Sequence, residues 1–215
     1  MPDLKQICIA CKAECCKRYW ITLVPEQAQT IANSLNLSLA DFIQTYTVLY
    51  LQLISVPVSV QDPFFFARNQ LSEKIQMQLT ETKNFDQNFF ALPLLALKRL
   101  PSENSKKACI FLKNNFECSI YSVRPTQCSL FPYVQSDSVE SLKKIYPFCN
   151  LIEHVSSEPQ KISKHEQAVK NYFDQVKEKG FQKVWQALPE NGFVFLNGKE
   201  LSEVSIRELS FFANP

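Results

Sequence analysis

Glycine is scarce in this chain of 215 residues. The sequence has 3 glycines, Gly180, Gly192 and Gly198, whereas an average usage of about 7% would give roughly 15. Rossmann fingerprints and P-loops need glycine because their backbone must approach a phosphate closely, and residues 1–179 contain none. The sequence therefore excludes an enzyme that binds nucleotides through a glycine-rich loop.

Concentrated basic charge and long apolar segments are also lacking. The chain has 23 basic and 21 acidic residues, and no short window is rich in Lys and Arg, so neither nucleic acid nor an anionic membrane surface is indicated as a partner. The longest apolar run, residues 89–97, is far shorter than the roughly 18–20 residues that cross a bilayer. No apolar stretch of signal-peptide length precedes Cys8, so we predict a cytoplasmic location.

Cysteine, in contrast, is abundant. Eight cysteines form two clusters: Cys8-x2-Cys11-x3-Cys15-Cys16, and, 92 residues later, Cys109, Cys118, Cys128 and Cys149. A reducing cytosol favours metal ligation over a disulfide framework, and thiols buried only for packing would be scattered singly among apolar neighbours. We therefore expect the eight cysteines to be metal ligands.

The spacing suggests how these ligands divide. A Cys-x2-Cys turn lets two sulfurs converge on one centre, as Cys8 and Cys11 can. The adjacent side chains of Cys15 and Cys16 diverge, so either they serve different centres or one of them is not a direct ligand. The hypothesis is two sites of four cysteines, each built from both clusters; a single centre with spare thiols is the alternative.

Sequence patterns predict an α+β fold stapled by metal. The expected order is a helical pair (residues 25–35 and 38–46), β-rich segments (48–60 and 75–79), a strand or short helix (89–97), polar connections (80–88 and 101–107), a hairpin (108–121), two helices (163–179 and 181–188), a hairpin (193–201) and a last short helix capped by Ser205. We predict one cysteine-cluster domain, 1–154, followed by a helical and hairpin extension, 155–215, which can pack on the same core.

The cysteine pattern resembles a known family. The first cluster, then Cys109-Ile-Phe-Leu, Cys118-Ser-Ile-Tyr, Arg124-Pro125-x2-Cys128, Phe131-Pro132 and Cys149, are similar to the CxxCxxCC family, the YkgJ-type zinc- or iron-chelating domain of bacteria. The resemblance covers residues 8 to about 150 and implies a bacterial cytosolic metalloprotein, with all eight cysteines at family positions. Two departures are the three residues 12–14 before the Cys-Cys pair, where the family usually has two, and Ser129, where it often has arginine.

Several functions stay open at this point. The cofactor is either Zn²⁺ or an iron–sulfur cluster, and enzymatic activity is undecided. A redox or S-adenosylmethionine-dependent protein-modification enzyme is one alternative, and Cys16 beside Lys17 and Arg18 is the candidate redox thiol. A metal-dependent adaptor that binds a protein partner is the other alternative. Arg124 is a candidate for hydrogen bonding to a thiolate, and His154 for a reserve metal ligand.

Overall fold

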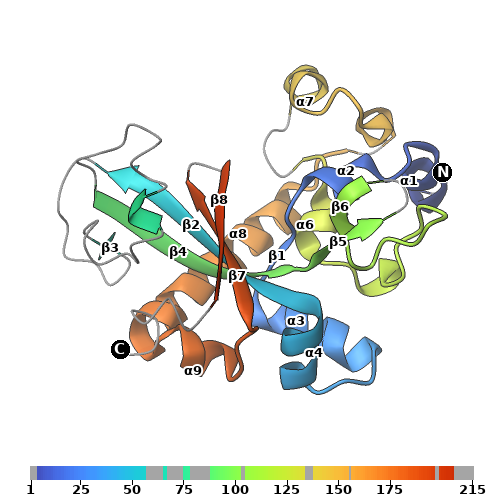
Figure 1. The fold of residues 1–215 in the computed structure, drawn as a ribbon. Coiled ribbons are helices and arrows are strands. Elements are labelled where there is room, and N and C mark those ends of the chain that lie inside the picture. The colour runs from blue at the N-terminus through green and yellow to red at the C-terminus, as the bar shows by residue number, and fades with distance from the viewer. Residues whose placement is uncertain are drawn as a thin grey trace. The chain divides into compact units, whose positions relative to one another are not determined.

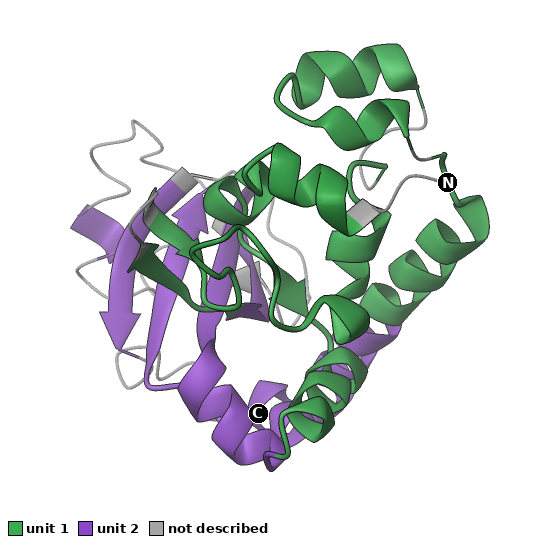
Figure 2. Ribbon diagram, turned by 90° about the vertical axis from the view of Figure 1, so that its right-hand side faces the viewer, with its two compact units in different colours: residues 1–36, 97–170 green, residues 37–96, 171–215 purple. Residues whose placement is uncertain are grey.

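The computed structural model describes residues 4–56, 65–66, 75–77, 88–102, 105–133, 138–154, 156–196 and 199–205. It mixes helices and strands, as predicted, and its C-terminal part contains a long helix and a strand hairpin (Figure 1). The chain divides into two compact units, each made of two chain segments: unit 1 is residues 1–36 and 97–170, and unit 2 is residues 37–96 and 171–215 (Figure 2). All eight cysteines belong to unit 1. None of the described helices is long and apolar enough to cross a membrane.

Unit 1 consists of short elements. They are α1 (Leu4–Ala10), α2 (Glu14–Arg18), β1 (Thr22–Leu23), α3 (Pro25–Ser34), the antiparallel pair β5 (Arg99–Ser102) and β6 (Ser105–Cys109), the 3-10 helix η2 (Tyr121–Val123), α6 (Thr126–Leu130), α7 (Val139–Ile145), the 3-10 helix η3 (Asn150–Glu153) and the first half of α8 (Pro159–Lys179). Proline in its first turn starts α3, whose buried face is Ala28, Ile31 and Ala32, so this predicted helix is confirmed.

Unit 2 is organised around a sheet. Its elements are α4 (Leu39–Tyr46), β2 (Thr47–Val56), β3 (Phe65–Phe66), β4 (Asn88–Leu97, all but its last residue), the second half of α8, α9 (Phe181–Trp185), β7 (Asn191–Leu196) and β8 (Lys199–Ser205). The strand order is β4-β2-β7-β8, with β2 and β7 parallel, β7 and β8 antiparallel, and β3 antiparallel to β4. The side chain of Ser38 accepts a hydrogen bond from the backbone N–H of Asp41 and caps α4, as predicted.

The core of unit 2 contains one buried polar chain. The Tyr172 hydroxyl donates to the carbonyl of Pro93 at 2.6 Å and accepts from Trp185 Nε1 at 3.1 Å. Trp185 is fully buried and Tyr172 is 1% exposed. The indole N–H and the tyrosine hydroxyl therefore cannot bond to water and depend on these two hydrogen bonds. Unit 2 therefore has a well-packed core that contains no cysteine.

Gly192 supplies a stability prediction for unit 2. It faces Leu49 across β7 and β2, and a Cβ on Gly192 would lie 2.8 Å from the Cβ of Leu49. The Gly192→Ala variant should therefore lose about 1–3 kcal/mol of unfolding free energy, because two central strands would have to move apart. Urea denaturation measures this loss, and an unchanged midpoint would contradict the close packing. Metal content should not change, because every cysteine lies in unit 1.

Other sequence expectations have mixed outcomes. The β-rich pattern of 48–60 is confirmed for residues 48–56, and the 193–201 hairpin and the end of α8 at Gly180 (φ 84°) are confirmed as well. Residues 89–97, for which a strand and a short helix were both open, lie in the strand β4. Residues 75–77 are helical, so the strand expected there is wrong: an alternating pattern over so few residues does not distinguish the two structures. Residues 57–60, 78–87 and the helix expected after Ser205 lie outside the described residues.

Two local predictions are wrong for reasons of geometry. Helix α8 begins at Pro159 and not at Ser163, because proline has the backbone angle of a first helical residue and overrides the weaker capping pattern. The 101–107 connection is instead part of the β5–β6 hairpin, where a register shift between Leu100 and Ser102 accommodates Pro101. The hairpin expected at 108–121 reduces to one bridge between Leu112 and Cys118.

Candidate metal centre

Six of the eight cysteines line one cavity in unit 1. The cavity has a volume of about 130 Å³, and its sulfur-bearing residues are Cys8, Cys15, Cys16, Cys109, Cys118 and Cys128. They come from α1, α2, the end of β6, the Leu112–Cys118 bridge and α6. Both sequence clusters thus meet at one place, although 92 residues separate them.

The turn between α1 and α2 accommodates the three-residue spacing before the Cys-Cys pair. Lys12 (φ 55°) and Ala13 (φ 48°) both adopt left-handed backbone, which costs a non-glycine residue about 1–2 kcal/mol. The turn is closed by hydrogen bonds from the N–H of Ala13 to the carbonyl of Cys8 and from the N–H of Cys16 to the carbonyl of Ala13. Ala13 is 3% exposed and lines the cavity, so this strained turn directs α2 toward it.

Cys15 and Cys16 lie on α2, directly after its first residue, Glu14. Both line the cavity, and their thiols hydrogen-bond to one another. This hydrogen bond and burial hold the pKa of Cys15 well above its ordinary value. Cys15 in turn adds to the raised pKa of Cys8, Cys109, Cys118, Cys128 and Cys149.

The remaining thiols, other than Cys16, divide into two groups according to which of them act electrostatically on Cys8 and which on Cys128. Burial raises the pKa of Cys8 to about 12, and Cys15, Cys11 and Cys149 add to the shift. Burial likewise raises the pKa of Cys128, and there the neighbouring thiols are Cys109, Cys15 and Cys118. We call Cys8, Cys11 and Cys149 the first thiol group, and Cys109, Cys118 and Cys128 the second thiol group. Because buried thiols are protonated at neutral pH, a metal that binds here must displace protons.

Four cysteines receive backbone hydrogen bonds from residues that follow them, among them Cys15, whose sulfur accepts from the N–H of Cys16. The sulfur of Cys109 accepts from the N–H of Phe111, and that of Cys118 from the N–H of Ile120. Burial raises the pKa of Cys149 to about 11, and the N–H groups of Leu151 and Ile152 oppose that shift. Such donors stabilise a sulfur that carries negative charge, as a metal-bound sulfur does.

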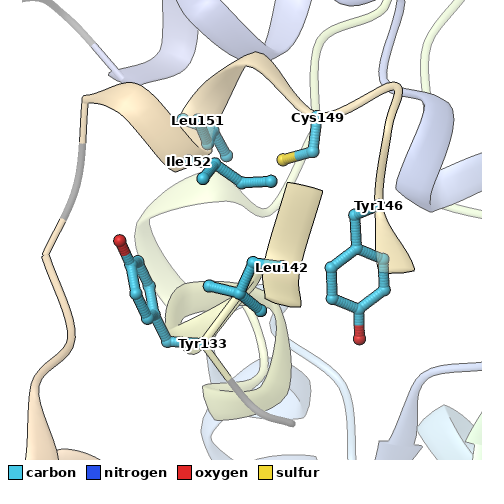
Figure 3. Close-up of a cluster of buried hydrophobic side chains, with 6 residues drawn as sticks. All are labelled: Tyr133, Leu142, Tyr146, Cys149, Leu151 and Ile152. Carbon is cyan, nitrogen blue, oxygen red and sulfur yellow. The ribbon is translucent and has the colours of Figure 1, made fainter. Parts of the chain in front are cut away.

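Cys11 and Cys149 do not line the cavity. Cys149 is 8% exposed and packs in an apolar cluster with Tyr133, Leu142, Tyr146, Leu151 and Ile152, and Figure 3 shows its sulfur turned inward among these side chains. Cys8 and Ile7 of α1 pack against the same cluster. The thiol of Cys11 donates to the carbonyl of Cys8 at 3.2 Å. The first thiol group therefore lies where α1 meets the apolar cluster.

Aromatic side chains form part of the cavity wall. Tyr19, directly after α2, has its ring centroid 6.0 Å from that of Phe131 and 5.8 Å from that of Tyr146, and all three residues line the cavity. Burial raises the pKa of both tyrosines. This aromatic wall was not predicted from the sequence, and it places apolar surface beside the thiols.

Hydrogen bonds across the chain hold α6, and with it Cys128, in place. The side-chain carbonyl of Gln127 accepts from the backbone N–H and the hydroxyl of Thr22, at 3.1 and 3.3 Å. Gln27 of α3 donates to the hydroxyl of Thr126 at 2.7 Å. These anchors were not predicted, because 99 to 105 residues separate the partners and neither glutamine carries a motif.

Oxygen and nitrogen ligands are not gathered around the thiols. The Glu14 carboxylate pairs with Lys17 and Arg18, Glu117 pairs with Lys5 at 3.0 Å, and His154 is exposed. Within the described part of the chain, no three Cys, His, Asp or Glu side chains are grouped as ligands of a single metal ion. A tetrahedral zinc site with bonds of about 2.3 Å would bring its sulfurs to about 3.8 Å from one another.

The thiol set nevertheless fits a larger sulfur-ligated group. All eight cysteines are free, six line one cavity, and four accept backbone N–H hydrogen bonds. A cavity of about 150 Å³ can admit benzene, so this one has room for several metal atoms. The site is thus that of a cysteine-rich metal-chelating domain.

Comparison with known proteins agrees with this class. Residues 7–150 match the family CxxCxxCC, described as "Putative zinc- or iron-chelating domain". Because the match covers most of the chain, the protein belongs to the CxxCxxCC family. No curated protein and no solved structure matched the chain in the corresponding comparisons.

Proposed function

We propose that unit 1 holds iron–sulfur clusters, and not zinc ions, in the cytoplasm. The observation that supports this most directly is that six thiols line one cavity while no three described ligand side chains surround a single point. A cluster spaces its cysteines more widely than a zinc ion does, because iron atoms and inorganic sulfides lie between them. The eight free thiols also suit a reducing compartment.

All eight cysteines are the proposed ligands, in two centres. The first thiol group provides three ligands of one centre, and the second thiol group provides three of the other. Cys15 and Cys16 provide the fourth ligand of each. Their thiols hydrogen-bond to one another, and that bond would be given up when both sulfurs lose their protons and bind metal. When bound, an iron–sulfur cluster supplies one-electron transfer. The protein itself would hold each cluster, keep water away with the aromatic wall, and donate backbone N–H groups to the sulfurs.

The redox-thiol alternative has less support than cluster binding. That alternative requires Lys17 and Arg18 to favour the thiolate form of Cys16. Both cations instead pair with the carboxylate of Glu14. Lys17 also lies over the ring of Phe116, at 5.5 Å from its centroid. The adaptor alternative needs an exposed apolar patch. The sequence offers Phe211 and Phe212 for it, and both lie outside the described residues.

Anaerobic purification followed by spectroscopy and elemental analysis tests the proposal. We expect a coloured protein with a broad visible absorption that bleaches on reduction, and iron and acid-labile sulfide in about equal amounts. Iron, sulfide and zinc should be measured on the same sample. A colourless protein that contains zinc at stoichiometric amounts would overturn the iron–sulfur proposal and leave metal chelation intact.

A further inference from the structure

Arg124 is a cation in the wall of the cysteine cavity. It follows η2 and precedes Pro125, is half-buried, and lines the cavity with the six thiols. Its guanidinium carbon lies 4.2 Å from the centroid of the Tyr121 ring, and Tyr121 also lines the cavity. Stacking on the Tyr121 ring and the fixed backbone of Pro125 both restrict where the guanidinium charge can lie.

No carboxylate of the described residues neutralises Arg124. The two glutamates next to cysteines pair with other cations: Glu14 with Lys17 and Arg18, and Glu117, which also lines the cavity, with Lys5. The groups that share the cavity wall with Arg124 and can acquire negative charge include three thiols, those of Cys8, Cys118 and Cys128. Cys8 belongs to the first thiol group, and Cys118 and Cys128 belong to the second.

A partly buried guanidinium is stable when an anion compensates its lost hydration. Four thiolates bring more negative charge to a metal centre than one zinc ion or one oxidised cluster carries in positive charge, so the ligated centre is an anion. Its charge would develop beside Arg124 only when metal is bound. The same cation would stabilise a reduced cluster more than an oxidised one, because reduction adds negative charge.

We propose that Arg124 is the counter-charge of the metal centre, strengthening metal binding and raising the reduction potential of a bound cluster. The inference rests on the proposed metal-binding function, but it does not depend on which metal is present. It assigns Arg124 the role of a positioning residue that acts through the sulfur ligands.

Three variants test this role: Arg124→Gln, Arg124→Lys and the control Arg18→Gln. Arg18 also stacks on an aromatic ring, that of Phe148 at 4.8 Å, but it is solvent-exposed and does not line the cavity. Each purified protein is titrated anaerobically with a chelator, and remaining metal is measured. We expect Arg124→Gln to lose half its metal at about 10–100-fold lower chelator concentration. Arg124→Lys should retain most of the wild-type resistance, and Arg18→Gln all of it.

Two outcomes would overturn the proposal: wild-type resistance in Arg124→Gln, or equal loss in Arg124→Gln and Arg124→Lys, which would indicate stacking on Tyr121 and not charge. The second readout is the potential of the visible chromophore, which should become more negative in Arg124→Gln. Circular dichroism of the metal-loaded forms verifies equal folding before the chelator is added. If the wild type contains zinc, the iron–sulfur proposal fails, whereas the chelator titration still decides the role of Arg124.

Discussion

A protein carrying Cys128→Ser is expected to contain about half of the wild-type metal and to melt at a markedly lower temperature. Cys128 lies on α6, lines the cavity and has Cys109, Cys15 and Cys118 as neighbouring thiols. Serine is nearly the same size, so the change removes a soft sulfur ligand with little effect on packing. Structural metal contributes about 10–16 kcal/mol in small domains, which is comparable with a whole domain stability of about 5–15 kcal/mol. Elemental analysis and thermal denaturation measure the two effects.

Cys149→Ser is the matched variant, because it removes a ligand from the first thiol group. Two centres predict that Cys128→Ser and Cys149→Ser each lose a different half of the metal, and that the double variant retains almost none. If either single variant releases all of the metal, the eight cysteines serve one centre. Wild-type metal content and melting temperature in Cys128→Ser would show that this cysteine is not a ligand.

Local chemistry explains which parts of the fold could be predicted. Helices α3 and α4 carry their start signals in their own sequence, a first-turn proline and the Ser38 cap, and the spacing of their apolar residues defines the buried face. The segment 89–97 was ambiguous by the same reasoning. Because the run is apolar throughout, it shows neither the two-residue period of a strand nor the 3.6-residue period of a helix. Its pairing with β3 in the folded sheet makes it a strand.

Long-range structure could not be predicted in the same way. Units 1 and 2 each consist of two chain segments, and no change of composition marks residues 36 or 97. The domain boundary predicted at 154 therefore stays a prediction. Within the site, the cysteines were evident because their side chains are rare and regularly spaced. Gln127 and Tyr19 were not, because their roles depend on partners far away along the chain.

One consequence of this organisation is that metal removal should affect the two units differently. All eight cysteines, and every residue that lines their cavity, belong to unit 1. Its elements are short: α1 has 7 residues and α2 and α6 have 5 each, and isolated helices of this length are not stable in water. If the cysteines are the metal ligands, as proposed, metal removal takes away the bonds that would join α1 and α2 to β6 and α6.

We therefore expect chelator-treated protein to show a large increase in amide hydrogen exchange in α1, α2, η2, α6 and η3. Exchange in β2, β7 and the second half of α8 should change much less, because Leu51, Trp185 and Tyr172 pack there without any cysteine. Peptide-resolved exchange of the metal-loaded and metal-free protein measures this contrast. Gly192→Ala provides the opposite control, with increased exchange in β2 and β7 while the metal is retained. Equal loss of protection in both units would mean that they unfold together, and protection unchanged throughout would mean that metal contributes little to the fold of unit 1.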